Sequence, residues 1–421
     1  MKKLAVTLLA IVQIMGAACF SACNNGGETP TTSVEQTGKL QTVDTYSLDV
    51  IDKYLNPIWQ TSEIYDEGGV IVGETGEIQL LRKPVKNSVI VRSVHFEETY
   101  REGIDYVVDG NVIRRIPTGS MPYFKYEEYY FDAPYEGSHL LCDPGKAEIS
   151  YEGEKYLYYS EGAAGVKNYV MISYRTEEAY TQFMPSGDNG AQNFVNKVKT
   201  DKEATIMFYG DSITHGSCAS GTDFGGNVNP YLPKWGELVC QWIGKTYDAD
   251  INYLNKAQGG WTTQQGVDNF KGGENRVGPY LDEIDMLFIA FGANDPYLSD
   301  AGYKGQIKEM VDMYLDAQPD GSIVLVSPFV FNLQTSNWYI NQPRFEGLLE
   351  EIKAEYAANG KSKNISVAKV YSFFKGVCDT GKRSRDYLGN NINHPNDYGV
   401  RMYAQVALKT MFGEEFFPLG E

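Results

Sequence analysis

The first half of the chain alternates short apolar runs with clusters of turn-forming residues. The runs are rich in β-branched and aromatic residues, which is typical of β-strands. They predict strands at 77–81, 88–91, 106–108, 111–113, 155–159 and 169–173. Between two of these runs, Asp109, Gly110 and Asn111 favour a hairpin turn. We therefore expect an all-β sandwich or jelly roll over residues 41–182.

From about residue 204 the pattern changes to strands that alternate with amphipathic helices. Apolar runs predict strands at 204–209, 251–254, 286–291, 322–326 and 365–370. Longer stretches predict helices at 235–246, 303–317 and 344–358, and a last helix that begins near Asn396. The almost wholly apolar run at 286–291 is typical of a strand buried on both faces. This alternation indicates a parallel sheet covered by helices on both sides.

The first 40 residues are predicted to be a targeting segment and a tether. An apolar stretch at 4–18 follows two lysines and is too short to span a bilayer comfortably. Small residues and Cys23 come next, an arrangement that resembles a bacterial lipoprotein signal, although Phe20 stands where leucine is usual. The resemblance implies a signal peptide at 1–23, a lipid on Cys23 and a flexible tether at 24–40. Ordinary secretory cleavage just before the cysteine is the alternative, and both imply export.

Length and charge narrow the possible functions. With 421 residues the chain is too long for one core, so we expect a β domain at 41–182 and a second domain at 204–421. The intervening residues 183–203, rich in Pro, Gly and charges, are predicted to be a linker. A net charge of −18 disfavours nucleic acid and anionic lipid as partners but does not penalise a neutral sugar ester. The cysteines lack metal-ligand spacing, so we predict neither a metal nor a cofactor.

The end of the predicted strand at 204–209 holds the first candidate for catalysis. This strand runs into Gly210, Asp211 and Ser212. Ligands of open parallel sheets bind at the carboxyl ends of the strands, where the Ser212 hydroxyl would be presented. Taken alone, the three residues are equally consistent with a plain strand-to-helix turn capped by Asp or Ser.

Four segments of the chain resemble, in order, the sequence blocks of the SGNH/GDSL hydrolase family. They lie at 210–216, 255–262, 291–295 and 391–396, and the resemblance extends over about residues 203–415. It implies a flavodoxin-like, three-layer α/β fold for the second domain. It also implies a serine esterase that needs no cofactor.

The resemblance assigns a role to each block. Ser212 is the expected nucleophile, and His394 is the base that takes its proton and returns it to the departing alcohol. The backbone N–H groups of Ser212 and Gly260 and the side-chain amide of Asn294 are expected to form the oxyanion hole.

One position departs from the family pattern. Three residues before the catalytic histidine the family usually has aspartate, which orients the ring, but this chain has Asn391. An amide oxygen can accept the Nδ1–H but cannot neutralise imidazolium. Three readings remain open: Asn391 or a backbone carbonyl holds His394, Asp386 or Asp397 takes over the role, or activity is weak or lost. We expect the first, with Asn391 as the third catalytic residue.

Residues beside the blocks are candidates for binding substrate. His215, Trp261 and Asp295 are predicted to line the substrate site, although Asp211 and Asp295 are also expected to hold their loops. Phe224 and Tyr297 lie near the blocks and are expected to shape a small pocket.

The order of the two domains resembles carbohydrate esterase family 2, in which a jelly roll precedes the hydrolase. This resemblance implies an exported, lipid-anchored enzyme of the bacterial cell envelope that removes short acyl groups, notably acetyl, from polysaccharides or oligosaccharides. A lipid esterase or thioesterase is one alternative. A catalytically weak glycan-binding lipoprotein is another, and Asn391 is the feature that favours it. We expect a monomer.

Overall fold

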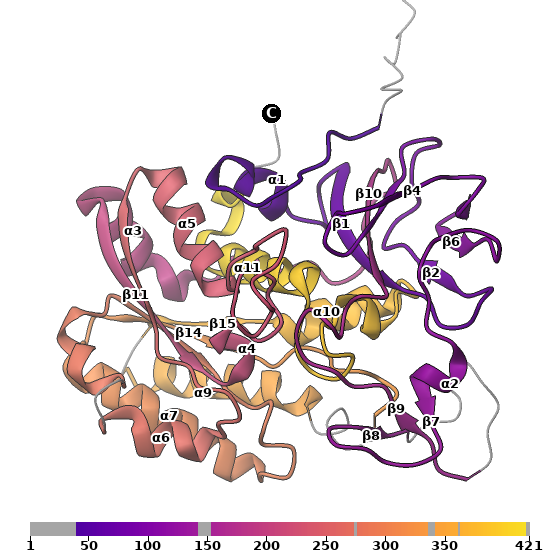
Figure 1. The fold of residues 1–421 in the computed structure, drawn as a ribbon. Helices are drawn as coiled ribbons and strands as arrows, with labels where there is room; N and C mark the ends of the chain where they lie inside the picture. The colour runs from indigo at the N-terminus through magenta and orange to yellow at the C-terminus, as the bar shows by residue number, and fades with distance from the viewer. Residues whose placement is uncertain (1–38, 142–152, 273–275, 336–341, 361–362, 418–421) are drawn as a thin grey trace, which may run out of the picture. The chain divides into compact units, whose positions relative to one another are not determined.

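A parallel sheet of five strands lies at the centre of the second half of the described chain (Figure 1). The computed structural model describes residues 39–141, 153–272, 276–335, 342–360 and 363–417. The strands are β11 (Glu203–Gly210), β12 (Asp250–Asn255), β13 (Met286–Ala290), β14 (Ser322–Val326) and β15 (Ile365–Ala368). Their order is β12-β11-β13-β14-β15, with parallel neighbours throughout. This is the flavodoxin-like order, so the predicted α/β fold is confirmed.

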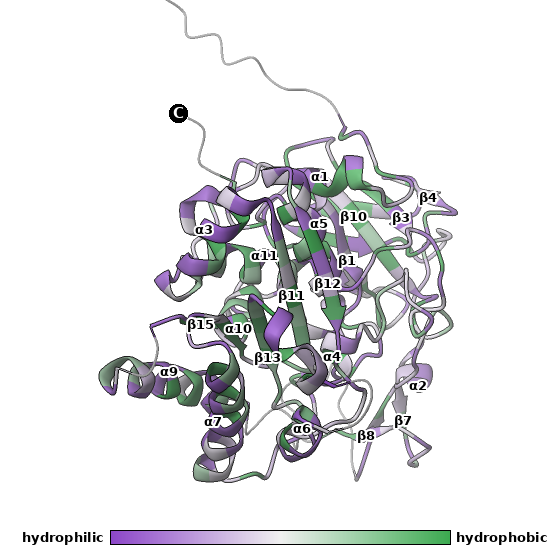
Figure 2. Cartoon of the chain, turned by 90° about the vertical axis from the view of Figure 1, so that its left-hand side faces the viewer, coloured by the Kyte–Doolittle hydropathy of each residue, from purple (hydrophilic) through white to green (hydrophobic). Residues whose placement is uncertain are grey.

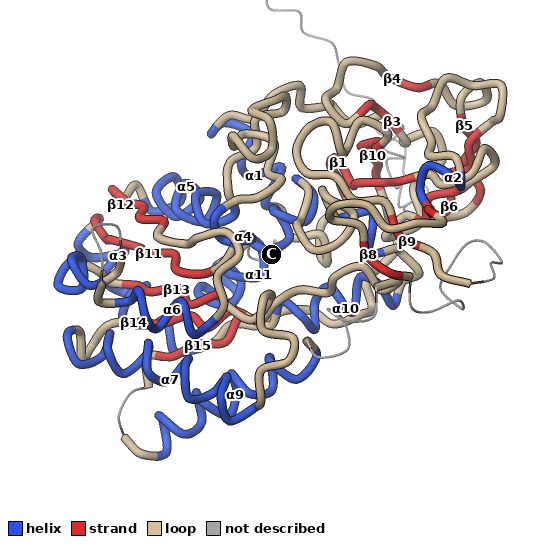
Figure 3. Tube along the Cα trace, turned by 60° about the horizontal axis from the view of Figure 1, so that its bottom comes forward, coloured by secondary structure: helices blue, strands red, loops and turns tan. Residues whose placement is uncertain are grey.

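Helices cover both faces of this sheet (Figure 3). Side chains alternate along β11, so that Ile206 and Phe208 join one core while Met207 and Tyr209 join another. The first core is covered by α3 (Gln192–Asp201), α5 (Trp235–Tyr247), α10 (Val370–Asp379) and α11 (Asp397–Phe412). The second is covered by α6 (Thr263–Phe270), α7 (Asp300–Ala317) and α9 (Pro343–Ala358). Apolar and polar residues occupy different sides of α7 and α9, as expected for helices with one buried face (Figure 2).

The first half of the described chain, here called the β part (residues 41–182), forms antiparallel sheets. Its strands are β1 (Glu63–Val70), β2 (Glu77–Gln79), β3 (Ile90–Ser93), β4 (Thr99–Tyr100), β5 (Tyr106–Asp109), β6 (Val112–Arg115), β7 (Tyr130–Phe131), β8 (His139–Leu140), β9 (Tyr156–Leu157) and β10 (Tyr169–Arg175). They pair in the orders β1-β10-β3-β4, β2-β6-β5 and β7-β9-β8. The short helix α1 (Ile51–Leu55) precedes them, and α2 (Tyr126–Tyr129) lies between β6 and β7. The expected β region before the parallel sheet is confirmed.

The segment predicted to be a linker, residues 183–203, is largely helical. It contains a 3-10 turn at Asn189–Ala191 and then α3, which packs against β11. Phe194, Val195 and Val198, which lies about one turn after the other two, are buried there and anchor the helix to the core. The interpretation as a linker was wrong because the Pro and Gly residues that suggested it all precede this apolar stripe.

The β part and the parallel sheet share one hydrophobic core. The core that contains Ile206 and Phe208 also contains Val170 and Tyr174 of β10, and residues 38–421 form one compact unit. Buried charges reinforce the junction, since Lys382 Nζ lies 2.6 Å from Glu67 of β1 and 3.4 Å from Asp386. Segments of the β part are therefore held firmly against the loops at the end of the parallel sheet.

The predicted signal peptide, the lipidation site Cys23 and almost all of the tether lie outside the described residues. No helix among the described residues combines the length and apolarity needed to cross a membrane.

Candidate active site

Ser212 lies at the carboxyl end of β11, the strand between β12 and β13, as the first residue of the single-turn helix α4 (Ser212–His215). The first N–H groups of a helix have no partner inside the helix, so the Ser212 N–H is available to a ligand. Asp211 precedes it as the helix cap and accepts from Ile213 N at 3.0 Å. Burial raises the pKa of Asp211 to about 7. Asp211 therefore holds the loop, as expected, and leaves the hydroxyl of Ser212 free to react.

His394 faces Ser212. Its Nε2 lies 2.8 Å from Ser212 Oγ, although the two residues are 182 positions apart in sequence. Asn390 holds the histidine loop through its Oδ1, which accepts the backbone N–H of His394 at 2.9 Å. The two residues that the motifs assigned as nucleophile and base thus meet at hydrogen-bond distance.

The other two proposed oxyanion donors follow the neighbouring strands. The loop after β12 is fixed to the end of β11 by the bond from Gln258 N to Gly210 O, 3.0 Å long. In that loop Gly260 has a φ of 77°, a left-handed conformation that favours glycine. A Cβ built on the adjacent Gly259 would lie 4.0 Å from Ser212 Cβ, which places this loop beside the nucleophile.

Asn294 follows β13 and is half-buried. Its Nδ2 donates to the backbone oxygen of Trp261 at 2.9 Å. A side-chain amide carries two N–H groups, so this bond fixes the amide and leaves its second N–H for a ligand. Ser212, Gly260 and Asn294 therefore come from the ends of three adjacent strands, as an oxyanion hole requires.

Asn391, the expected partner of His394, forms its side-chain hydrogen bonds with other residues. It is fully buried with a φ of 69°. Its Oδ1, the atom that the imidazole would need, accepts from Tyr129 Oη at 2.8 Å and from Asn332 Nδ2 at 3.3 Å. Its Nδ2 donates to the backbone oxygen of Tyr158 at 2.8 Å. The prediction that Asn391 orients His394 was wrong, because the amide is bonded to the β part instead.

The carboxylates of the two alternative aspartates also bond to groups other than His394. Asp386 Oδ1 accepts from Val70 N at 2.9 Å, and its Oδ2 faces Lys382. Asp397 Oδ1 accepts from Ser220 N at 2.8 Å, and burial raises its pKa to about 6. Both carboxylates therefore stabilise loops.

A carboxylate from the β part faces the histidine. Glu161, in the loop between β9 and β10, places Oε1 2.8 Å from His394 Nδ1. The contact has the distance of an ion pair but not the straight angle of a hydrogen bond, and Nδ1 has no hydrogen-bond partner among the described residues. Such contacts are often loose without substrate and tighten when it binds.

Three donors hold the Glu161 carboxylate. Tyr159 Oη and Asn390 Nδ2 each donate to Oε1 at 2.9 Å, and the Cys218 thiol donates to Oε2 at 3.0 Å. Burial alone would raise the pKa of Glu161, but the His394 contact and the bonds from Cys218 and Asn390 lower it to about 2. Glu161 is therefore anionic at neutral pH.

Sequence reasoning missed Glu161 because nothing local distinguishes it. It lies in the loop after β9, just behind a Tyr-rich stretch, and is 229 residues from Asn390, whose amide donates to it. The one local signal is the run of small residues after it. A Cβ on Gly162 would come within 3.3 Å of Phe224 O, so this loop packs closely on the loop that follows α4.

The predicted substrate-binding residues differ in their placement. The ring of His215 lies 5.2 Å from that of Phe224, and burial lowers its pKa with help from Lys234. Trp261 is half-buried, with the Arg276 guanidinium 4.2 Å from the centre of its ring.

Asp295 is not available to substrate. It is 6% exposed, and its carboxylate accepts the Thr263 N–H and hydroxyl at 3.0–3.2 Å. Its prediction as a substrate-binding residue was wrong, because the first turn of α6 uses this carboxylate to satisfy its free N–H.

Glu161, Cys218 and His394 also have the chemistry of metal ligands. Among the described residues they form a group whose ligand atoms lie within 4.8 Å of one another. A metal would need the cysteine as thiolate, whereas burial, with the neighbouring Glu161, raises the pKa of the Cys218 thiol. The structure therefore favours the thiol as a hydrogen-bond donor to Glu161.

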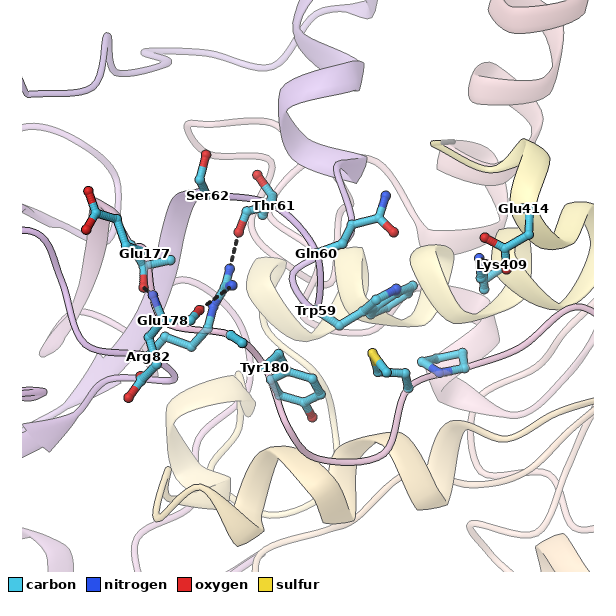
Figure 4. Close-up of a pocket in the computed structure, with 14 residues that line it drawn as sticks. Trp59, Gln60, Thr61, Ser62, Arg82, Glu177, Glu178, Tyr180, Lys409 and Glu414 are labelled. Carbon is cyan, nitrogen blue, oxygen red and sulfur yellow. Dashed lines mark hydrogen bonds and ion pairs between the residues drawn. The ribbon is translucent and has the colours of Figure 1, made fainter. Parts of the chain in front are cut away.

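A separate cavity of about 550 Å³ lies between the β part and α11 (Figure 4). Trp59, Arg82, Tyr180 and Lys409 are among the residues that line it. Arg82 spans it by donating to the backbone oxygens of Thr61 and Glu178. Neither Ser212 nor His394 lines this cavity, so it is distinct from the catalytic site.

The second half of the chain is similar to a known protein family. A sequence model of the GDSL-like lipase/acylhydrolase family matches residues 208–402. No curated protein matches the chain.

The solved structures that are similar to this chain include those of three hydrolases. A two-domain esterase (CEX) active on acetylated mannans is 22% identical over 52% of this chain, with a TM-score of 0.40, and the match spans about half (52%) of that protein. A lipase/acylhydrolase from Enterococcus faecalis is 19% identical, covering 49% of this chain and 94% of that one, with a TM-score of 0.36. A variant of an acetylxylan esterase from Geobacillus stearothermophilus is 19% identical, covering 52% and 99%, with a TM-score of 0.39.

Proposed function

We propose that the protein is a carboxylic ester hydrolase that removes short acyl groups from carbohydrate by a Ser–His mechanism. The match of residues 208–402 to the GDSL-like lipase/acylhydrolase family supports this proposal. The observation that carries the proposal is the 2.8 Å approach of His394 Nε2 to Ser212 Oγ at the carboxyl end of β11.

In the first half of the reaction, Ser212 Oγ attacks the ester carbonyl while His394 Nε2 takes the hydroxyl proton. The carbonyl oxygen becomes an oxyanion, which the N–H groups of Ser212 and Gly260 and the Asn294 amide stabilise. The intermediate collapses, the bond to the sugar oxygen breaks, and His394 gives its proton to that oxygen. The sugar leaves as an alcohol, and the acyl group remains on Ser212.

In the second half, water takes the place of the alcohol. His394 removes a proton from the water, whose oxygen attacks the acyl carbon and regenerates the oxyanion. Collapse releases the carboxylic acid and returns the proton from His394 to Ser212. The same donors therefore serve both steps, and no cofactor is consumed.

Exposed aromatic rings support a carbohydrate as the alcohol component. Phe224 is 57% exposed beside His215, and Tyr297, three residues after Asn294, is 76% exposed. Large exposed rings near a catalytic site are candidates for contact with the apolar face of a ligand. The net charge of −18 is compatible with a neutral sugar ester and unfavourable for anionic lipid.

The test is release of acetate from a panel of acetylated glycans by the wild type, Ser212→Ala and His394→Ala. Acetylated mannans and xylans are suitable first substrates, because they are the substrates named for two of the similar structures. We expect both substitutions to abolish release. Unchanged turnover in either variant would refute the assignment, and faster cleavage of long-chain than of acetyl p-nitrophenyl esters would favour a lipid esterase.

A further inference from the structure

We propose that Glu161 is the positioning residue of His394, and that it replaces, from the β part, the acid that SGNH/GDSL hydrolases usually carry three residues before their histidine. The inference rests on the proposed function, since it concerns how the same histidine is made competent.

The chemistry of the histidine requires such a group. When Nε2 takes the Ser212 proton, the ring becomes a cation, and Nδ1 must carry a proton throughout. A carboxylate at Nδ1 selects this tautomer and balances the new charge. Glu161 meets both needs, because its Oε1 lies 2.8 Å from Nδ1 and its low pKa keeps it anionic.

The donors around Glu161 tie it to both catalytic loops. Asn390 belongs to the loop that carries His394, and Cys218 lies six residues after Ser212. Tyr159 lies two residues before Glu161 in the same loop. The carboxylate is therefore fixed relative to the nucleophile and the base together, which is what a positioning residue needs.

Asn391 explains why the acid comes from elsewhere. Its Nδ2 donates to the Tyr158 carbonyl, and its Oδ1 accepts from Tyr129. Tyr129 precedes β7 and Tyr158 follows β9, the strand paired with it, and the chain after β9 leads directly to Glu161. Asn391 thus holds the segment that delivers the carboxylate, and an aspartate there would lack the N–H that bonds to Tyr158.

The experiment compares Glu161→Gln with Glu154→Gln in acetyl ester hydrolysis. Glu154 is a matched control, because it is exposed, lies on the other side of β9 in the same segment and also accepts from a tyrosine hydroxyl, that of Tyr156, at 2.8 Å. We expect Glu161→Gln to lower kcat by about 10³-fold with little change in KM, and Glu154→Gln to change neither. The corresponding loss in a protease triad is about 10⁴-fold, and the 38% exposure of the Glu161 side chain lets water replace part of the carboxylate's effect.

Two further readouts separate positioning from general damage. Without its counter-charge the protonated imidazole is less favoured, so the acidic limb of the kcat/KM profile should move to lower pH in Glu161→Gln. Glu161→Ala should regain activity when formate is added, because a small carboxylate can occupy the vacated, partly exposed site.

The possible outcomes are distinct. Full activity of Glu161→Gln beside an inactive Ser212→Ala would overturn the role of Glu161 and leave the proposed function standing. An active Ser212→Ala would overturn the proposed function itself. Recovery of a Glu161→Gln enzyme by adding Asn391→Asp would also overturn the inference, as would loss of wild-type activity in EDTA with recovery in Zn²⁺, since Glu161, Cys218 and His394 would then act as metal ligands.

Discussion

Asn391→Asp restores the residue type that the family usually has at this position, yet the structure predicts that it is harmful. The Asn391 side chain is fully buried, and both ends of its amide are bonded. Aspartate keeps the acceptor for Tyr129 but loses the donor to the Tyr158 carbonyl, which lies 2.8 Å away.

The loss of folding stability expected in Asn391→Asp depends on pH. A buried carbonyl that loses its donor costs about 1–3 kcal/mol, and a carboxylate facing that carbonyl adds repulsion. Burial raises the pKa of the new carboxyl above that of the unfolded chain, so the folded state binds the proton more tightly and loses stability as pH rises. Near pH 4 the protonated acid can donate to Tyr158, and the cost should be about 1 kcal/mol or less; at pH 8 we expect about 3 kcal/mol.

The assay is thermal unfolding of the wild type and Asn391→Asp at pH 5 and pH 8, together with acetyl ester hydrolysis. Asn269→Asp is the control, because the Asn269 amide also donates to a backbone oxygen, that of Gln265, but on the exposed surface of α6. We expect only Asn391→Asp to melt lower at pH 8, to recover toward pH 5 and to lose activity. A variant as stable as the wild type at pH 8 and more active would show that residue 391 serves His394 directly, and the reasoning would fail.

Four further predictions follow from the geometry. Gly210→Ala should lower the melting temperature and the activity, because its Cβ would lie 2.4 Å from the carbonyl oxygen of Ala290 and force the strands apart at a cost of about 1–3 kcal/mol; a variant with wild-type melting would contradict this contact. Asn294→Ala should lower kcat by about 10²–10³-fold while KM changes little, and an unchanged kcat would remove it from the oxyanion hole. Because burial raises the pKa of Asp211 to about 7, the wild type should lose stability relative to Asp211→Asn as pH rises from about 4 to 7, and parallel melting curves would refute this. Cys23→Ser should move the expressed protein from the membrane fraction to the soluble fraction if the predicted lipid is attached there, whereas an unchanged distribution would argue for ordinary secretory cleavage.

The elements that the sequence predicted well are those with a local pattern. Most strands of the parallel sheet are short apolar runs, and Ser212 and His394, the proposed nucleophile and base, each lie in a recognisable block. The linker prediction failed for a local reason too. Composition was followed there, whereas Phe194, Val195 and Val198 have the spacing of the buried face of a helix, which in the structure packs on β11.

The role of Glu161 could not be predicted from the sequence, because it depends on contacts that form only in the folded chain. Apart from Tyr159, its neighbours come from two distant segments, one with Cys218 and one with Asn390 and His394, and neither pairing leaves a periodic trace in the sequence. The misassignment of Asn391 has the same origin. Asn391 stands at the family's position three residues before His394. Its side chain, however, forms hydrogen bonds with Tyr129 and Tyr158 of the β part.

The anchoring of β1 helps to explain how the β part can supply the Glu161 carboxylate to His394, which is distant in the sequence. Positioning within about half an ångström requires a rigid support, and β1 is held by buried charges on either side. The Arg401 guanidinium of α11 donates to the backbone oxygens of Tyr65 and Asp66 at 2.7 and 2.8 Å. Burial alone would lower the pKa of Lys382, but Glu67 and Asp386 raise it, so the lysine stays charged.

These contacts couple docking of the β part to catalysis. Removing one partner of a buried ion pair typically costs about 3–5 kcal/mol, because the other charge is left without compensation. The β part therefore cannot shift on the parallel sheet without a large loss of stability. In the active site that we propose, Glu161 reaches His394 only when that docking is complete, so the β part belongs to the catalytic machinery rather than serving as a separate appendage.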